Sequence, residues 1–181
     1  RLLRAMRALI HGRFAEAESL AAEALRLGQE AEDQQVESCL NVHREGQLRA
    51  AERHPEMLAQ AAVGRQYWAS FGLGASWQWV STALACARLE DAEQTRRYLA
   101  LVPPGMLPAT DNVYAMFYAA EPVALVGSAE QAEQLYDLLL PSADRDVVLG
   151  MTQLLWEGPV QRLLGLLAVR LGRWDEAWKY F

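Results

Sequence analysis

The chain has 181 residues, of which 52% are hydrophobic and 22% are charged, and its formal net charge is -6. This length suits one domain with a sizeable core, and this hydrophobic content excludes a disordered chain. The acidic balance argues against nucleic acid or an anionic membrane surface as partners, because both attract surplus lysine and arginine. No apolar run approaches the ~20 residues that span a bilayer. Because Cys39 and Cys86 are the only cysteines and lie in apolar helical stretches, we expect reduced, buried thiols in a cytoplasmic protein. We also expect no cofactor.

A six-residue pattern returns five times along the chain. It has a small leading residue, an apolar residue two positions later and alanine three positions after that, and acidic residues in most copies. The leading residues are 34, 41, 40 and 45 positions apart, and the copies lie at 12–17, 46–51, 87–92, 127–132 and 172–177. This pattern is typical of a tight turn between two helices, and its recurrence predicts a stack of five helical hairpins.

Helical periodicity on both sides of these turns predicts the helices in chain order. The first hairpin has one helix before Gly12 and one after it, which we expect to end at Gly28. The second hairpin covers about residues 33–67. We expect its second helix to break or restart at residues 54–55, because proline removes a backbone donor and clashes with the preceding turn. The third hairpin consists of helices at about residues 75–88 and 90–102.

The fourth hairpin is predicted to begin with a helix that Thr110 or Asp111 caps, that Pro122 kinks and that runs to about residue 126. Ser128 and Gln131 have the spacing of a capping box for the next helix, which we expect to end at 140–141.

The fifth hairpin follows an irregular stretch. Residues 142–150 are predicted to form a loop and residues 151–156 a short extra turn. Pro159 suits the first position of the next helix. No segment shows the alternation of a strand, so the sequence predicts an all-α fold.

The fifth copy resembles the tetratricopeptide class of helical repeats. Gly165, Ala177 and Phe181 stand seven before, five after and nine after Gly172, where that class has a small, a small and an aromatic residue. Tyr136 is the counterpart of Phe181 in the fourth copy. The resemblance implies a right-handed superhelical solenoid of about five hairpins.

A narrower resemblance lies in the C-terminal third of the chain. It is carried by residues 135–141, 147–150, 158–160 and 163–168, which are similar to segments of large bacterial regulators. Those regulators join a signalling ATPase module to a long tetratricopeptide-like region, and their output is a nucleotide cyclase or a winged or LuxR-type DNA-binding domain. The resemblance implies that residues 1–181 are a single sensor or partner-docking domain. Because no polar capping helix is visible at either end, we expect this domain to be a piece of a longer protein.

The sequence lacks the usual signatures of catalytic and metal sites. No phosphate-binding loop is present, and His11, His43 and His54 do not have the spacing of metal ligands. The acidic clusters fall in the first turns of second helices, where carboxylates favour the positive end of the helix dipole. We therefore expect these acids to be solvated capping groups.

The first helix of each hairpin supplies the candidate binding residues. In tetratricopeptide-like stacks this helix lines a concave groove, into which residues ten, six and three before the turn point. Aromatic residues at helical spacing are more often core residues. However, the residues found by this count and the arginines next to them combine aromatic, acidic and basic side chains, which suits binding of a peptide or a small polar ligand. The candidates are His43, Arg44, Trp77, Ser81, Phe117, Glu121, Arg162 and Arg170.

The predicted function is therefore non-catalytic: protein–protein interaction or signal sensing within a cytoplasmic bacterial regulator. The partner is a protein, a peptide or another domain of the same chain. One alternative is a helical domain that binds a small-molecule inducer, and a closed pocket lined by Trp77 and Phe117 would favour it. A second alternative, ranked last, is an enzyme, which a closed bundle with a buried polar cavity would favour. A homo-oligomer is a further alternative.

Overall fold

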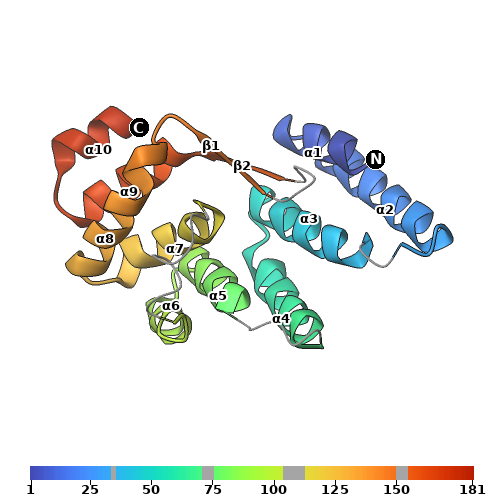
Figure 1. The fold of residues 1–181 in the computed structure, drawn as a ribbon, viewed down its shortest axis with the longest axis horizontal. Helices are drawn as coiled ribbons and strands as arrows, with labels where there is room; N and C mark the ends of the chain where they lie inside the picture. Colours follow the sequence, from blue (N-terminus) through green and yellow to red (C-terminus); the bar gives the residue numbers. More distant parts are fainter. Residues whose placement is uncertain (34–35, 71–75, 104–112, 150–154) are drawn as a thin grey trace. The chain divides into compact units, whose positions relative to one another are not determined.

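The computed structural model describes residues 1–33, 36–70, 76–103, 113–149 and 155–181, without the side chains of residues 37–38, 67–70, 76–77, 113–114 and 149 (Figure 1). By their contacts the residues gather into two compact units. Unit 1 comprises Arg1–Gln60 and Val148–Glu157, and unit 2 comprises Ala61–Val147 and Gly158–Phe181. We expected one domain, and we describe the two units separately. No helix in the described ranges is long and apolar enough to cross a membrane.

Unit 1 contains the first three helices and the beginning of the fourth. Helix α1 packs against α2, and α2 packs in turn against α3. Asn41 on α3 accepts a hydrogen bond of 3.2 Å from the amide of Gln60 on α4. The helices are α1 (Leu2–Ile10), α2 (Phe14–Glu30), α3 (Val36–Ala50) and α4 (His54–Ser70).

Unit 2 contains three helical hairpins whose first helices pack in sequence. Helix α7 packs against both α5 and α9, while α6 packs against α5 and α7, and α8 against α7 and α9 (Figure 1). Helices α6 and α8 therefore each contact their own hairpin and the next one, and α10 packs against α9. The helices are α5 (Ser76–Arg88), α6 (Ala92–Leu99), α7 (Val113–Val126), α8 (Ala129–Leu139), α9 (Val160–Arg170) and α10 (Trp174–Tyr180), and a 3-10 turn (Leu140–Ser142) follows α8.

Four of the five turns within hairpins share one backbone arrangement, which also follows the end of α2, at Glu32, before the next hairpin begins. A single residue adopts a left-handed conformation, with φ of 70° at Gly12, 55° at Glu52, 59° at Glu90 and 72° at Gly172. Its N–H donates to the carbonyl three residues back, and the next N–H donates to the carbonyl five residues back, at 2.8–3.1 Å. These bonds satisfy carbonyls that the end of a helix leaves without partners.

The turns correct the predicted register of the second and third hairpins. Residues 46–50 lie inside α3, and the turn is centred on Glu52 rather than on the 46–51 copy. The third turn is centred on Glu90, three residues after the predicted lead at Ala87. A non-glycine residue is uncommon in the left-handed region, so a search for small leading residues passes over both glutamates.

Two further helix boundaries were in question. A helix starts at residues 54–55, one of the two outcomes expected there, because Pro55 lies in the first turn of α4, where its missing N–H costs little. Gly28 does not end α2, which continues to Glu30. A Cβ atom on Gly28 would lie 2.2 Å from a methyl carbon of Val36, so this glycine allows a close approach.

With the register corrected, the five hairpins bury equivalent positions. The residue five positions after the turn lead is at most 3% exposed in every hairpin: Ala17, Met57, Thr95, Ala132 and Ala177. The predicted capping box of Ser128 and Gln131 is confirmed. The Phe181 ring lies 2.8 Å from the position that a Cβ atom on Gly165 would take. The small residue at position 165 therefore leaves room for the Phe181 ring. The described residues are mostly helical, as the sequence predicts.

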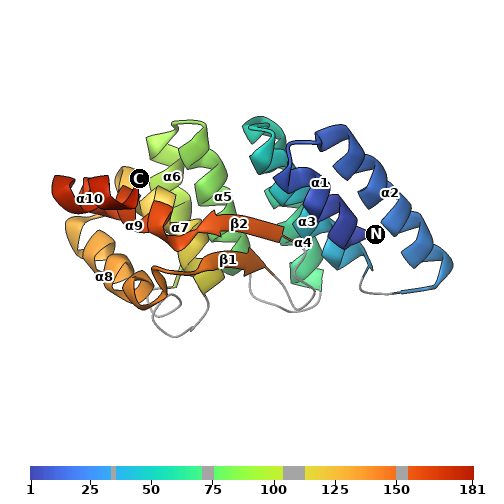
Figure 2. The same cartoon turned by 90° about the horizontal axis from the view of Figure 1, so that it is seen from above.

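The irregular stretch contains a strand pair that the sequence analysis did not predict. Strands β1 (Asp146–Leu149) and β2 (Leu155–Pro159) form a two-stranded sheet and run in opposite directions (Figure 2). The predicted loop at 142–150 was therefore wrong at residues 146–149, and the predicted turn at 151–156 was wrong at residues 155–156. Two strands of four and five residues are too short for a clear alternating pattern. Pro159 precedes α9 as its N-cap, one position earlier than predicted.

Residues from the strand pair complete the core of unit 1. Leu155 is 1% exposed and packs with Ala8, Leu9 and Ala17. A methyl carbon of Leu155 also lies 2.4 Å from the position that a Cβ atom on Gly46 would take. Gly46 is therefore required by close packing and not by a turn.

Substitution of Gly46 tests this packing. Alanine normally stabilises a helix relative to glycine, but we expect Gly46→Ala to destabilise the protein by about 1–3 kcal/mol, because overpacking forces neighbouring atoms to move. Leu155→Ala removes the three nearest contacting atoms, so the double variant should lose less stability than the two single changes added together. Urea unfolding measures this, with Gly64→Ala as the control because its Cβ atom would meet only a side-chain carbon of Gln78 at 3.7 Å. Strict additivity would contradict the proposed contact.

Candidate functional site

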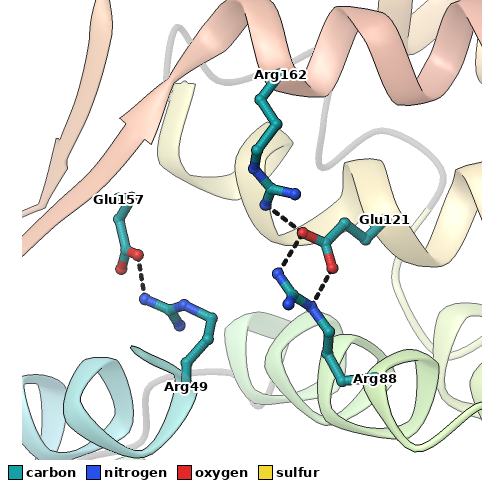
Figure 3. Close-up of polar contacts among 5 residues, drawn as sticks. All are labelled: Arg49, Arg88, Glu121, Glu157 and Arg162. Atoms are coloured by element: carbon teal, nitrogen blue, oxygen red, sulfur yellow. Dashed lines mark hydrogen bonds and ion pairs between the residues drawn. The ribbon is translucent and has the colours of Figure 1, made fainter. Parts of the chain in front are cut away.

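Three charged side chains from the first helices of unit 2 meet in one cluster (Figure 3). Arg88 ends α5, Glu121 lies within α7, and Arg162 lies in the first turn of α9. Arg88 donates to both carboxylate oxygens of Glu121, with a distance of 2.6 Å between its Nη2 and Oε1. Arg162 donates to the same Oε1. One carboxylate thus links three successive first helices.

The surroundings of Glu121 keep it ionised. Burial by itself would raise the pKa of its carboxyl group, but the charges of Arg162 and Arg88 and their hydrogen bonds outweigh burial and lower that pKa. The side chain of Glu121 is 12% exposed, whereas those of Arg88 and Arg162 are 28% and 37% exposed. Two guanidinium groups face one carboxylate, so the cluster carries one surplus positive charge that solvent can reach.

Apolar side chains continue this surface along two of the helices. Leu125 follows Glu121 by one helical turn and is 44% exposed, and Val169 follows Arg162 by two turns and is 39% exposed. Residues at this spacing share one face of a helix, and Leu166 is half-buried between Arg162 and Val169. We call this surface the first-helix face and define it by Arg88, Glu121, Leu125, Arg162, Leu166 and Val169.

The structure brings two of the predicted binding residues together, Glu121 and Arg162. Phe117 and Ser81 are 3% and 5% exposed, so their side chains belong to the core of unit 2 and not to an open groove. The ring of Phe117 lies 5.4 Å from that of Tyr118, edge to face. Trp77 is a residue of α5, but its side chain lies outside the described part of the structure.

The remaining predicted residues lie elsewhere. Arg170 donates to the backbone carbonyl of Gly127 and so ties α9 to the end of α7. His43 is fully buried in unit 1, and Arg44 on the same helix is exposed. Arg88 was missed because the third turn was placed three residues too early, so that Arg88 fell inside the predicted turn and was not among the residues counted back from it. One signal in the sequence could have found Arg88. Successive first helices carry an arginine on α5, a glutamate on α7 and an arginine on α9, and this alternation of charge favours ion pairs between them.

Unit 1 has a separate buried ion pair between Arg49 on α3 and Glu157 on β2 (Figure 3). Their side chains are 8% and 4% exposed. The second carboxylate oxygen of Glu157 is buried, and no hydrogen-bond partner for it lies within the described residues. This pair holds the strand pair against α3 beside the contact between Leu155 and Gly46.

A pocket in unit 1 lies between the α1–α2 turn and the end of α3. Its apolar lining consists of Leu9, Phe14, Leu48 and Ala51, and its polar lining of Glu18, Arg44, Gln47 and Arg53. The amide nitrogen of Gln47 is buried and has no hydrogen-bond partner in the described ranges. Arg53 pairs with Glu18 and Glu56, so the pocket presents the amide donor of Gln47 and the guanidinium group of Arg44.

Other reactive groups show structural roles. Burial raises the pKa of the Cys39 and Cys86 thiols, and nearby Asp33 and Asp91 raise it further, which disfavours the reactive thiolates. Over the residues described, no three His, Cys, Asp or Glu side chains gather closely enough to hold a metal ion. Part of the prediction for the acidic clusters is met: Glu16, Glu93, Glu130, Asp175 and Glu176 lie in the first turns of their helices, and Asp91 caps α6. Glu18 and Glu133 lie further along their helices and pair with Arg53 and Arg173, so they are not capping groups.

Comparisons of the chain with protein-family models, with curated proteins and with solved structures found no match.

Replacement of Glu121 by glutamine tests the charge cluster. We expect Glu121→Gln to lower stability at pH 7 by about 1.5–3 kcal/mol, because charge-assisted hydrogen bonds are lost and two arginines are left facing each other. The lowered pKa means that the carboxylate stabilises the fold fully above its ordinary value of 4.5, and that this stabilisation is lost as pH falls below 4.5. Thermal unfolding from pH 7 to pH 3 should therefore show a smaller acid loss for the variant. Parallel pH profiles for both proteins would contradict this assignment.

Proposed function

We propose that the chain is a non-catalytic helical-repeat segment that binds an acidic, partly apolar peptide of another protein or domain on the first-helix face. The observation that carries this proposal is the surplus positive charge at Arg88 and Arg162, which adjoins exposed Leu125 and Val169. Arginine beside apolar area is a combination common at protein interfaces. The charge is local, because the chain as a whole is acidic.

The tetratricopeptide resemblance supports this proposal and places it in a biological setting. Five hairpins with equivalent buried positions suit a solenoid of tetratricopeptide-like repeats, in which first helices present a binding face. The resemblance to multidomain bacterial regulators suits a sensor or docking arm, with catalysis or DNA binding supplied by other domains. A cytoplasmic location follows from the same proposal.

A small-molecule site is the second candidate function, and the pocket in unit 1 favours it. The buried amide of Gln47 and the exposed guanidinium of Arg44 suit a small carboxylate whose apolar part lies on the exposed ring of Phe14. NMR titration with hexanoate and with hexanol, observed at the Gln47 amide, separates recognition of the carboxylate from recognition of the apolar chain. Equal response to both compounds would argue against this candidate.

Binding to a peptide array tests the main proposal. The array carries 12-residue peptides with two to four acidic and two to four apolar residues, together with scrambled and basic versions. We expect acidic–apolar peptides to bind, with affinity that falls as salt rises, because exposed charges are screened. Replacing both arginines (R88Q with R162Q) should weaken binding by about tenfold or more, since truncating a central contact costs more than about 1 kcal/mol.

Arg26→Gln is the matched control, since Arg26 is an exposed arginine that pairs with Glu30 in unit 1. It should leave binding unchanged, and thermal unfolding must show that the double variant is still folded at the assay temperature. Binding that is equally strong for basic peptides, or that persists in the double variant, would overturn the proposal.

A further inference from the structure

The two arginines of the charge cluster use their donors unequally. Arg88 donates from both Nε and Nη2 to the carboxylate of Glu121, so the two groups form a bidentate pair. Arg162 donates to Glu121 from Nη2 alone, and this is its one hydrogen bond within the described residues. A guanidinium group carries five N–H donors in a planar fork. Arg162 therefore keeps four donors, which include a complete edge of the fork.

The surplus charge of the cluster is most accessible at Arg162. The bidentate pair of Arg88 and Glu121 is neutral by itself, so Arg162 carries the charge that is left over. Its side chain is 37% exposed, whereas that of Arg88 is 28% exposed. Arginine binds a carboxylate most strongly through two parallel hydrogen bonds from one edge. Of the two arginines, Arg162 is therefore the better placed to bind a carboxylate of a partner.

Leu125 is an exposed apolar residue at a fixed distance from this point. It stands four residues after Glu121 on α7, which is about 6 Å along the helix axis at 1.5 Å per residue, and on the same face of the helix. Its side chain is 44% exposed. Because α7 packs against both α5 and α9, the exposure of Leu125 is not due to a missing neighbouring first helix.

An extended peptide matches this distance between its residues i and i+2. Its residues rise by about 3.3 Å each, so two steps cover about 6.6 Å. Side chains i and i+2 of an extended chain also point to the same side, whereas side chains i+1 and i+3 point to the opposite side. A helical peptide matches the distance at i+4, but helices shorter than about 12 residues are marginal in water. A short helical segment therefore carries the additional cost of forming its helix.

We infer that the first-helix face recognises an extended segment with the pattern acidic-x-apolar, in which Arg162 binds the acidic side chain and Leu125 contacts the apolar one. Arg88 does not touch the segment. It is a positioning residue, which neutralises Glu121 and so leaves the charge of Arg162 available. This inference rests on the proposed function, to which it adds the spacing of the recognised side chains and separate roles for the two arginines.

A peptide series with varied spacing tests the inference on the full chain. Otherwise identical 12-residue peptides carry one aspartate and one leucine, which are one, two, three or four positions apart and in either order, and fluorescence anisotropy measures their affinity. We expect a separation of two to bind about fivefold or more tighter than one or three, because only that spacing places both side chains on one side. Equal affinities, or a maximum at four, would overturn the inference while the proposed function stands. If no acidic–apolar peptide binds at all, the proposed function itself fails.

Variants of the cluster test the separate roles of the arginines. Arg162→Lys keeps the charge but loses the planar fork, so it should weaken binding of the best peptide by about tenfold. Arg88→Gln should also weaken binding, because Glu121 then neutralises Arg162. Adding Glu121→Gln to Arg88→Gln again leaves one positive charge at Arg162, so this double variant should recover binding. Unchanged binding by Arg162→Lys, or a double variant that fails to recover, would overturn the assignment. Circular dichroism must show the same helical content for all variants.

The apolar contact has a matched pair of variants on the same face. Leu125→Ala should remove the preference for leucine over alanine at the apolar position of the peptide, whereas Val169→Ala should retain it. Both residues are exposed, at 44% and 39%, so neither change leaves a cavity in the core. Loss of the preference in Val169→Ala and its retention in Leu125→Ala would overturn the predicted spacing.

Discussion

The left-handed turn between paired helices is the constraint on which the rest of the structure depends. Two backbone N–H groups reach back across the end of the first helix, and the chain reverses in three residues. In the four hairpins that have this turn, it determines which side of the second helix faces its partner, so the residue five positions later is buried. In the fourth hairpin, Ala132 is buried in the same way after a different turn, at which Ser128 caps the second helix. The same register places Arg53 and Arg173 against the preceding hairpins. Glu52 and Glu90 adopt this conformation although non-glycine residues disfavour it by about 1–2 kcal/mol, which the packing on both sides must offset.

Unit 1 depends on a second kind of contact, made by residues distant in sequence. Leu155 fills the space that Gly46 leaves open, and Glu157 pairs with Arg49 three residues further along α3. The first contact contributes apolar burial. The second positions the strand through a buried ion pair, whose net contribution to stability is small because desolvation opposes it. A local stretch of the chain therefore does not contain the whole core of unit 1.

Charged contacts between successive hairpins have different consequences according to their burial. Arg53 and Glu18 are both largely exposed, so their ion pair selects a register more than it stabilises the fold. Glu121 is shielded from solvent and accepts from two arginines, so it links α5, α7 and α9 and holds both guanidinium groups in fixed positions. That fixed arrangement, beside exposed Leu125 and Val169, makes the first-helix face suited to binding. The cluster is at once a structural link and a candidate site.

Local patterns in the sequence determined the helices, the capping box at Ser128 and the close contact at Gly165, because each depends on residues within one or two hairpins. They also identified Glu121 and Arg162, since the turn at Gly127 and Gly172 was placed correctly. Only the tertiary structure decided the turns at Glu52 and Glu90, because the left-handed conformation of glutamate is imposed by packing rather than by its own preference. It likewise decided the strand pair, the burial of Phe117, Ser81 and His43, and the contact of Leu155 with Gly46. These features depend on contacts between residues far apart in sequence, for which no local pattern exists.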